Sequence, residues 1–272
     1  LLIQIMRPDA VTVKLHIDGR KTAVNMEKVD EAGFFAALVS SKKKLSYTYS
    51  VEKVNGEVTE YTDPYAFANV TKPEDYKAFL AGEEKNAAHI FGAHERTVNG
   101  VKGVLFNVWA PKALSVSVVG EFNKYDGRVH LMERIEDTGV FELFIPGLAA
   151  GCGYMYEIKR QGKGTTRKLD PVSRQISSVP ITASVVSDEN MPDSYAWNDG
   201  LWMIKRKKEA GKKKPVTVYE VSLTDWLKEK SADELVDFVK QEGYTHVCFL
   251  PVAEYLNEEM NGYSTLGYFA VT

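Results

Sequence analysis

An internal repeat limits the possible folds of this chain more than any other feature of its sequence. Four short segments occur twice, in the same order. PDAVTV at Pro8 resembles PKALSV at Pro111, and GFFAAL at Gly33 resembles GVFELF at Gly139. YTY at Tyr47 resembles YMY at Tyr154, and an Asp-Pro pair occurs at both Asp63 and Asp170. The Pro-to-Gly interval is 25 residues in the first copy and 28 in the second, and the Gly-to-Asp interval is 30 and 31. Equal order and nearly equal spacing predict two modules of related fold.

Each copy consists of short segments in which apolar and polar residues alternate, with turn-forming residues about every ten positions. Alternation with period two is typical of strands with one buried face, and many such strands are typical of an antiparallel β-sandwich. The sequence therefore predicts a mainly β chain with two tandem immunoglobulin-like β-sandwiches, an N-terminal module at 1–68 and a second module at 97–190.

A short helix is predicted between the two modules, within a connecting region at 69–96. The segment Thr71-Lys-Pro-Glu74 has the form of a capping box. Tyr76, Phe79 and Leu80 then fall at helical spacing and form one apolar face. These features predict a connecting helix of about residues 73 to 85.

A polar segment, EFNKYDG at residues 121–127 and called the aromatic loop from here on, follows a predicted strand of the second module. It carries Phe122 and Tyr125 beside Asn123 and Asp126. The C–H face of a pyranose packs on aromatic rings, and its hydroxyls bind amides and carboxylates. The sequence therefore predicts a sugar-binding loop.

The first copy has no such loop, because its corresponding segment, LHIDGRKTA from Leu15, contains no aromatic residue. We therefore expect ligand binding in the second module and interpret the first as a spacer or a partner-packing module. Stacking that removes about 80 Å² of apolar surface contributes at most about 2 kcal/mol, which predicts weak binding that gains from avidity on a polymer. The alternative is that Phe122 and Tyr125 pack against their own sandwich.

A basic run, KRKKEAGKKK at 205–214, contains seven Lys or Arg in ten positions. It could bind RNA or anionic lipid, or it could be a solvated helix or linker. No aromatic residue interleaves with the run and the formal net charge of the chain is −3. We therefore assign 191–215 as a basic linker and predict neither a nucleic-acid nor a membrane partner, since no apolar run approaches the ~20 residues that span a bilayer.

The last 57 residues, 216–272, have the pattern of a βαβ unit. A β-rich segment from Val216 precedes a capping box, Ser231-Ala-Asp-Glu234, and an amphipathic stretch that ends at Gly243. A nearly continuous apolar strand follows, as in parallel sheets. Because a (β/α)8 barrel needs about 250 residues, we expect 216–272 to be the truncated start of such a barrel and the chain to be the front of a longer protein.

The remaining reactive side chains predict no cofactor and no metal site. Cys152 and Cys248 lie far apart without metal-ligand spacing, which favours a reducing, cytoplasmic location. His94, His246, Glu220 and Glu254 are interpreted as structural. Trp109 could be a sugar platform, but it lies within a strand pattern ahead of Pro111 and is predicted to be a core residue.

Many short motifs resemble those of the 1,4-α-glucan (glycogen) branching enzymes of the α-amylase superfamily, in the order in which the N-terminal part of that family has them. In the first module and connector these are GFFAAL at Gly33, DPYAF at Asp63 and FGAH at Phe91. The second module adds FNVWAP at Phe106, VSVVGEFN at Val116, YDG at Tyr125, FELFIPG at Phe141 and YMYE at Tyr154. The final segment adds VYEV at Val218, LPVAE at Leu250 and GYSTLGYFA at Gly262.

This resemblance implies an enzyme that cleaves an α-1,4 bond of a glucan and transfers the freed segment to a 6-hydroxyl, using a retaining pair of carboxylates. It implies no catalytic residue in this chain, because the family's carboxylates lie beyond its second barrel unit, so the chain alone is expected to be inactive in branching. It implies that Phe122, Asn123, Tyr125 and Asp126 bind α-1,4-glucan or glycogen, and that Tyr263 stacks under a sugar in the barrel.

The partners implied are thus the glucan and the remainder of the catalytic barrel. Two alternatives stay open at this point. The chain could be a non-catalytic glucan-binding module, or it could be the front of a debranching or trehalose-forming enzyme of the same superfamily.

Overall fold

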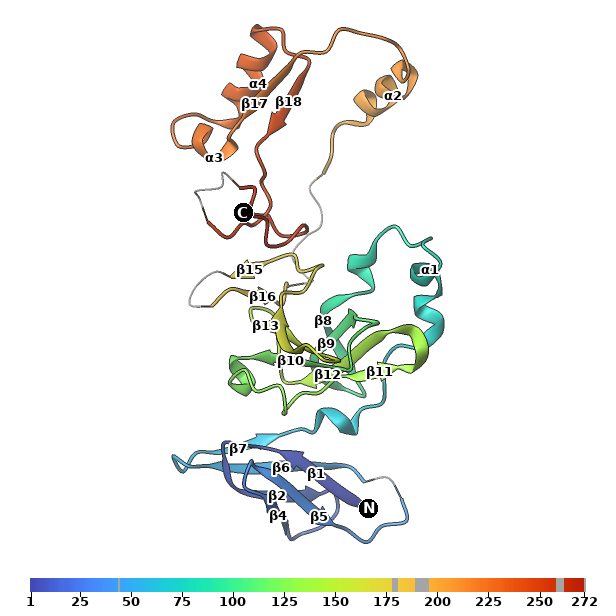
Figure 1. The fold of residues 1–272 in the computed structure, drawn as a ribbon, viewed down its shortest axis with the longest axis vertical. Coiled ribbons are helices and arrows are strands. Elements are labelled where there is room, and N and C mark those ends of the chain that lie inside the picture. The colour runs from blue at the N-terminus through green and yellow to red at the C-terminus, as the bar shows by residue number, and fades with distance from the viewer. Residues whose placement is uncertain (44, 178–180, 189–195, 258–261, 272) are drawn as a thin grey trace. The chain divides into compact units, whose positions relative to one another are not determined.

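The structure is a computed structural model that describes residues 1–43, 45–177, 181–188, 196–257 and 262–271. The chain divides into two compact units, Leu1–Asp188 and Glu189–Thr272 (Figure 1). The predicted boundary between 190 and 191 lies outside the described residues. The first unit contains both copies of the repeat and is described before the second.

The first module consists of two antiparallel sheets, with strand orders β1-β5-β4 and β3-β2-β6-β7 (Figure 1). Its strands are β1 Leu2–Met6, β2 Ala10–Ile17, β3 Val24–Asn25, β4 Glu27–Asp30, β5 Phe34–Leu38, β6 Tyr47–Lys53 and β7 Val58–Tyr61. Inward-facing residues of both sheets form one core, which includes Ile5, Val13, Leu15, Phe35 and Tyr49. Alternation in the sequence therefore produces two sheets that cover each other's apolar face.

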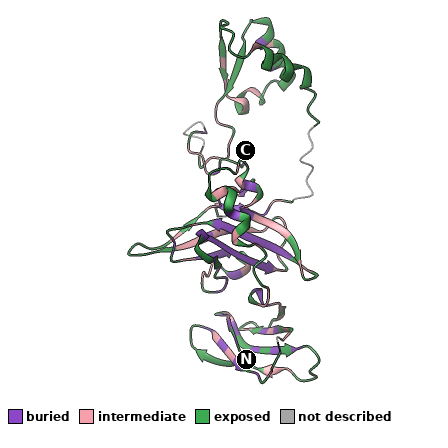
Figure 2. Ribbon diagram, turned by 90° about the vertical axis from the view of Figure 1, so that its right-hand side faces the viewer, coloured by how far each residue is buried: buried purple, intermediate pink, exposed green. Residues whose placement is uncertain are grey.

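The second module has the same plan, with one sheet ordered β10-β13-β16-β15, in which β14 also pairs with β13, and another ordered β11-β12-β9-β8. Its strands are β8 Gly92–Val98, β9 Val101–Trp109, β10 Ser115–Gly120, β11 Glu133–Ile135, β12 Val140–Pro146, β13 Gly153–Arg160, β14 Gly164–Lys168, β15 Ile176–Ser177 and β16 Ala183–Val185. The buried residues of each module lie mainly on its strands (Figure 2). The predicted mainly β class is confirmed for the described residues.

The Tyr-x-Tyr and Asp-Pro segments of the repeat build the same buried hydrogen-bond cluster in both modules. The hydroxyls of Tyr47 and Tyr49 donate to Asp63 Oδ2 at 2.8 and 3.0 Å, and the backbone N–H of Tyr65 donates to Asp63 Oδ1. In the second module the hydroxyls of Tyr154 and Tyr156 donate to Asp170 Oδ2 at 2.7 and 3.1 Å, and the N–H of Val172 donates to Asp170 Oδ1. The repeat thus preserves partners for a buried carboxylate, which is costly to leave unpaired.

The Pro and Gly segments of the repeat also meet in space. Gly33 and Gly139 both have positive φ, at 96° and 76°. A Cβ on Gly33 would collide with Pro8, and one on Gly139 would lie 2.8 Å from Pro111 Cβ. Glycine is required at both places because the conformation is left-handed and the proline of the same module closes over it.

The first module ends with the short turn η1 Pro64–Ala66, and the connector after it is mostly short turns as well: η2 Pro73–Tyr76, α1 Lys77–Leu80 and η3 Ala87–His89. The prediction of a helix to about residue 85 was therefore wrong. Gly82 adopts φ +75° and its N–H donates to the Phe79 carbonyl, which ends the helix after one turn. Asp75 caps the Lys72 N–H, so the cap begins one residue after the predicted Thr71.

A buried carboxylate fixes the connector to the second module. Glu142 on β12 is 1% exposed and accepts hydrogen bonds from the backbone N–H groups of Val70 and Thr71, from the Thr71 hydroxyl and from Asn107 Nδ2. Asn107 also donates to the Tyr76 hydroxyl at 2.8 Å. The Thr71 side chain is thus held by the sheet and is unavailable to cap a helix.

The second unit contains a βαβ arrangement, as the sequence predicts. Strands β17 Val218–Val221 and β18 His246–Phe249 pair in parallel. Between them lie α3 Leu223–Trp226 and α4 Ala232–Gln241, and α4 begins with the predicted Ser231–Glu234 capping box. Leu235 and Val239 of α4 are buried.

The basic run begins in a helix with no buried residue, α2 Gly200–Glu209, and continues as exposed chain. This exposure agrees with the interpretation of a solvated helix and linker. No helix among the described residues has the length and apolar character needed to cross a bilayer.

Candidate functional site

The aromatic loop follows β10 as a 3-10 turn, η4 Glu121–Asn123, and then two left-handed residues. Lys124 has φ 53° and Tyr125 has φ 57°. Left-handed backbone costs a non-glycine residue about 1–2 kcal/mol, so two in succession need support from their surroundings. Backbone bonds from Lys124 N–H to the Glu121 carbonyl and from Tyr125 N–H to the Gly120 carbonyl, at 3.0 and 2.8 Å, supply part of that support.

Asn123 is directed into the protein and is 7% exposed. Its Oδ1 accepts the Gly120 N–H at 3.0 Å, and its Nδ2 donates to the Val118 carbonyl and to His130 Nδ1, both at 2.9 Å. Both ends of the amide are therefore engaged within the second module. Its contribution to the loop is to hold the turn closed.

Tyr125 lies on the outer side of the loop and is partly exposed. Arg167 of β14 donates from Nη2 to the Tyr125 carbonyl at 2.8 Å, and its guanidinium carbon lies 5.8 Å from the centre of the Tyr125 ring. Arg167 Nε also donates to Glu157 Oε2 of β13 at 3.1 Å. Because the guanidinium lies over one face of the partly exposed ring, a stacking ligand would use the opposite face, with the guanidinium and the carboxylate nearby as hydrogen-bonding groups.

Sequence reasoning did not identify Arg167 or Glu157 as part of the site. Arg167 is 42 residues from Tyr125 in the chain, and only the pairing of β13 with β14 brings it there. In that register Arg167 lies opposite Glu157. The sequence of β14 alone does not show which residue of β13 each of its side chains faces.

The other two predicted site residues have different surroundings. Phe122 is half-buried and packs against the core of the second module, with its ring centre 5.5 Å from that of His130. Asp126 forms a bidentate pair with Arg128, and these hydrogen bonds lower the pKa of Asp126. The carboxylate therefore stays ionised and keeps the loop folded on its C-terminal side.

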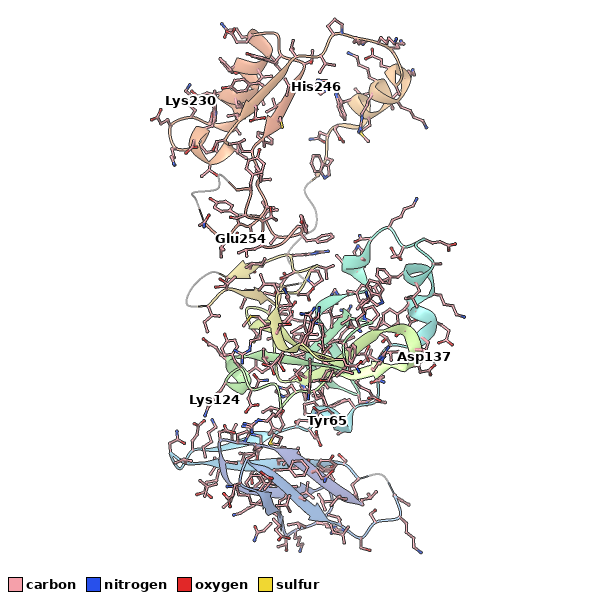
Figure 3. The ribbon with its side chains drawn as sticks, in the orientation of Figure 1. Tyr65, Lys124, Asp137, Lys230, His246 and Glu254 are labelled. Carbon is pink, nitrogen blue, oxygen red and sulfur yellow. The ribbon has the colours of Figure 1, made fainter. Side chains whose placement is uncertain are left out.

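The inner side of the loop borders a cavity of about 460 Å³ between the two modules of the first unit. Phe122, Asn123, Lys124 and Asp126 are among its lining residues. The first module contributes Arg7, Pro8, Asp9 and Lys53. Figure 3 shows Lys124 on the side of the loop that faces the first module, where its Nζ lies 3.9 Å from Asp9 Oδ2.

His130, which sequence reasoning also missed, is 2% exposed and lies beneath the loop. Burial, with a smaller effect from the positive charge of Arg7, lowers the pKa of His130 to about 3. The imidazole is therefore neutral at physiological pH. Its only sequence signal is that it follows the loop by a few residues.

Tyr263, predicted to stack on sugar in the barrel, lies in the second unit and is 63% exposed. It follows Gly262, whose φ is +84°, and precedes Ser264, whose carbonyl accepts the Leu256 N–H. Tyr255 and Thr265 pair in an isolated antiparallel β-bridge. The structure therefore shows an exposed ring, and its stacking on a sugar stays a prediction.

The prediction that Trp109 is a core residue was wrong. Its side chain is 47% exposed at the end of β9, with its ring edge against Phe79 at 5.3 Å between ring centres. Side chains alternate along β9, so Trp109 lies on the face opposite the core residues Val104, Phe106 and Val108, where Phe79 of the connector covers it only in part. Among the described residues, no group of His, Cys, Asp and Glu side chains is arranged to hold a metal ion.

Two family profiles match separate parts of the chain. Residues 1–65 match the N-terminal domain of the alpha-1,4-glucan branching enzyme GlgB, and residues 90–173 match carbohydrate-binding module 48, the isoamylase N-terminal domain. The aromatic loop, Glu157 and Arg167 all lie within the second match.

Curated relatives are similar along most or all of the chain. The 1,4-alpha-glucan branching enzyme GlgB of Methylococcus capsulatus is 36% identical over 100% of this chain and 37% of its own length. Those of Nitrosococcus oceani and Cereibacter sphaeroides are 39% and 36% identical, over 85% and 100% of this chain and 32% and 38% of their own lengths. The chain therefore spans about a third of the length of these relatives, and a debranching or trehalose-forming enzyme is not favoured.

Proposed function

Because this chain corresponds to the N-terminal portion of the 1,4-alpha-glucan branching enzymes, we propose that it binds α-1,4-glucan through the aromatic loop of its second module. The observation that carries the proposal is the Tyr125 ring, which is partly exposed and held beside Arg167 and Glu157. A glucose unit would stack its C–H face on Tyr125, while its hydroxyls would bind the guanidinium and the carboxylate.

Phe122, Asn123 and Asp126 act in this proposal mainly by shaping the loop. Asn123 and Asp126 use their polar groups within the loop and its surroundings, and Phe122 packs on the core. Stacking on one tyrosine contributes at most about 2 kcal/mol, so each contact is weak. A branched polymer that presents many chain ends compensates through avidity.

We assign the two β modules, at 1–68 and 97–190, to the immunoglobulin-like type, joined by 69–96. The βαβ unit at 216–272 is assigned as the start of a (β/α)8 barrel after the linker at 191–215. Support comes from the face-to-face sheets of each module and from the parallel pairing of β17 and β18.

In the whole protein, the proposed activity is transfer of an α-1,4-glucan segment to a 6-hydroxyl, in glycogen formation in the cytoplasm. The chain would bring glucan to a catalytic barrel whose carboxylates lie outside it, and the rest of that barrel is its proposed partner. Tyr263 would stack on a sugar there. This assignment is supported by the similarity to branching enzymes over the whole chain.

The test is native gel electrophoresis in gels that contain increasing amounts of glycogen. We expect Tyr125→Ala to raise the apparent dissociation constant about tenfold, since it removes most of a stacking contact worth at most about 2 kcal/mol. Trp109→Ala, which removes an exposed aromatic of the same module outside the loop, is the control and should migrate like the unmodified chain. Equal retardation of Tyr125→Ala and the unmodified chain would contradict the proposal.

A further inference from the structure

The first module reaches the aromatic loop through a series of three hydrogen-bonded side chains, of which Tyr61 is partly buried and His130 and Asn123 are buried. Tyr61, the last residue of β7, has its hydroxyl 2.6 Å from His130 Nε2. His130 Nδ1 in turn lies 2.9 Å from Asn123 Nδ2, inside the loop. Tyr61 and His130 are 69 residues apart in sequence, so this contact exists only because the two modules are docked.

The direction of each hydrogen bond in the series Tyr61–His130–Asn123 follows from the groups around it. Asn123 Oδ1 must face the Gly120 N–H, a donor, and Nδ2 must face the Val118 carbonyl, an acceptor, which fixes the orientation of the amide. Nδ2 therefore donates its second hydrogen to His130 Nδ1. A neutral imidazole with an unprotonated Nδ1 carries its proton on Nε2, so His130 donates to the Tyr61 hydroxyl oxygen.

The series of hydrogen bonds ends at the part of the loop whose backbone conformation is least favourable. Asn123 immediately precedes the two left-handed residues Lys124 and Tyr125. Backbone in that region persists where surrounding contacts over-determine it. The imidazole accepts a hydrogen bond from the residue that closes the turn, and Tyr61 holds the imidazole in the required orientation.

We propose that the first module is a positioning element for the glucan-binding loop: Tyr61, acting through His130 and Asn123, holds the loop in its ligand-binding shape. The glucan part of this inference rests on the proposed function of the loop. It gives the first module, which lacks an aromatic loop of its own, a specific role beyond that of a spacer.

A second tyrosine at the same junction provides a matched control. Tyr65 donates from its hydroxyl to the Leu131 carbonyl at 3.0 Å and accepts from the Leu131 N–H at 2.9 Å (Figure 3 shows Tyr65). These bonds also dock the first module on the second. They do not involve the side chains of His130 or Asn123, although Leu131 follows His130 in the sequence, so their loss should weaken docking while the bonds from Tyr61 to His130 and from Asn123 to His130 remain.

The experiment compares Tyr61→Phe with Tyr65→Phe in the full chain, each lacking one hydroxyl. We expect Tyr61→Phe to leave the His130 N–H buried without a partner and to speed hydrogen exchange of the Gly120 and Tyr125 amides roughly tenfold. Glycogen affinity in the gel assay should fall severalfold. Tyr65→Phe should keep loop exchange and glycogen affinity at their unmodified values.

Unchanged loop exchange in Tyr61→Phe would overturn the proposal, and so would equal changes in both variants, because docking alone would then explain them. If Tyr61→Phe speeds loop exchange while glycogen affinity stays unchanged, the loop's shape does not serve binding and the proposal also fails. If the unmodified chain is not retarded by glycogen, the proposed glucan function fails, and loop exchange alone decides whether Tyr61 positions the loop.

A variant of His130, the central residue, tests the same series of hydrogen bonds independently. His130→Asn keeps an acceptor near the Nδ1 position but has no atom at the Nε2 position, so it should behave like Tyr61→Phe. The double variant, with both Tyr61→Phe and His130→Asn, should show no further increase in loop exchange, since both changes remove the same hydrogen bond between Tyr61 and His130. Additive effects would contradict the proposal, and if His130→Asn fails to fold, the comparison of Tyr61→Phe with Tyr65→Phe decides.

Discussion

At the scale of single residues, the site depends on side chains whose chemistry is set by burial. His130 is surrounded by Asn123, Phe122, Tyr61 and the charge of Arg7, and both of its ring nitrogens are engaged. A proton on Nδ1 would face the Asn123 N–H and bring a second positive charge near Arg7. The neutral form is therefore the one that the folded chain accommodates.

This leads to a prediction about pH. Burial lowers the pKa of His130 from 6.5 to about 3, so the unfolded chain takes up a proton below pH 6.5 while the folded chain does not. The free energy of unfolding should therefore fall as pH decreases from 7, by about 2 kcal/mol at pH 5 from this residue. Urea unfolding at pH 7 and pH 5 measures the loss. His130→Asn should lose correspondingly less over the same range, and an equal loss would contradict the assignment.

At the scale of elements, the repeated tyrosine-aspartate clusters tie neighbouring segments of each module together. Asp170 joins β13 to the turn after β14, and Asp63 joins β6 to the turn after β7. Burial raises the pKa of Asp170, because desolvation outweighs its hydrogen bonds. The clusters explain why these residues recur in both copies, since each buried acceptor needs all of its donors.

Replacing the carboxylate with an amide should destabilise the second module. Asp170→Asn puts an N–H donor group where an acceptor is needed, at a site where the tyrosine hydroxyls and the Val172 N–H all donate. We expect a loss of about 1–3 kcal/mol in the free energy of unfolding. Thermal and urea unfolding measure it, with Asp137→Asn in an exposed turn of the same module as the control. Equal stability of the two variants would show that the cluster is not needed.

The elements also show which features could be predicted from local pattern. Alternation predicted strands at β9 and β10, and the Ser231 capping box predicted the start of α4, because those signals lie within a few residues of the structure they specify. The connecting helix was predicted too long because Thr71 is held by Glu142 and because Gly82 takes a left-handed conformation. The burial of Trp109 was predicted wrongly because it lies on the face of β9 away from the core, and the strand pattern does not show how much of that face the connector covers.

At the scale of the whole chain, the proposed glucan loop and the residues that position it all lie in the first compact unit, Leu1–Asp188. Tyr61, Asn123, His130 and Arg167 belong to this unit. The second unit contributes a βαβ arrangement and the exposed Tyr263.

A fragment of residues 1–188 should therefore fold and bind glycogen like the full chain. Its cores are complete without the second unit. We expect the same gel retardation within about twofold, because the described side chains that contact the loop, such as His130 and Arg167, all belong to residues 1–188. The same glycogen gel tests it, alongside the full chain and its Tyr125→Ala variant. A loss of retardation comparable to that of Tyr125→Ala would place binding determinants in the second unit.

The two related β modules, the loop that distinguishes them and the βαβ pattern at the end can all be read from the order of residues alone. These follow from repeats, alternation and turn residues, which act over short distances along the chain. Only the tertiary structure placed Arg167 beside Tyr125 and Tyr61 beside His130, across 42 and 69 residues of sequence. Such contacts depend on strand register and on module docking, which no local pattern encodes. They hold the aromatic loop in the shape that we propose binds glucan.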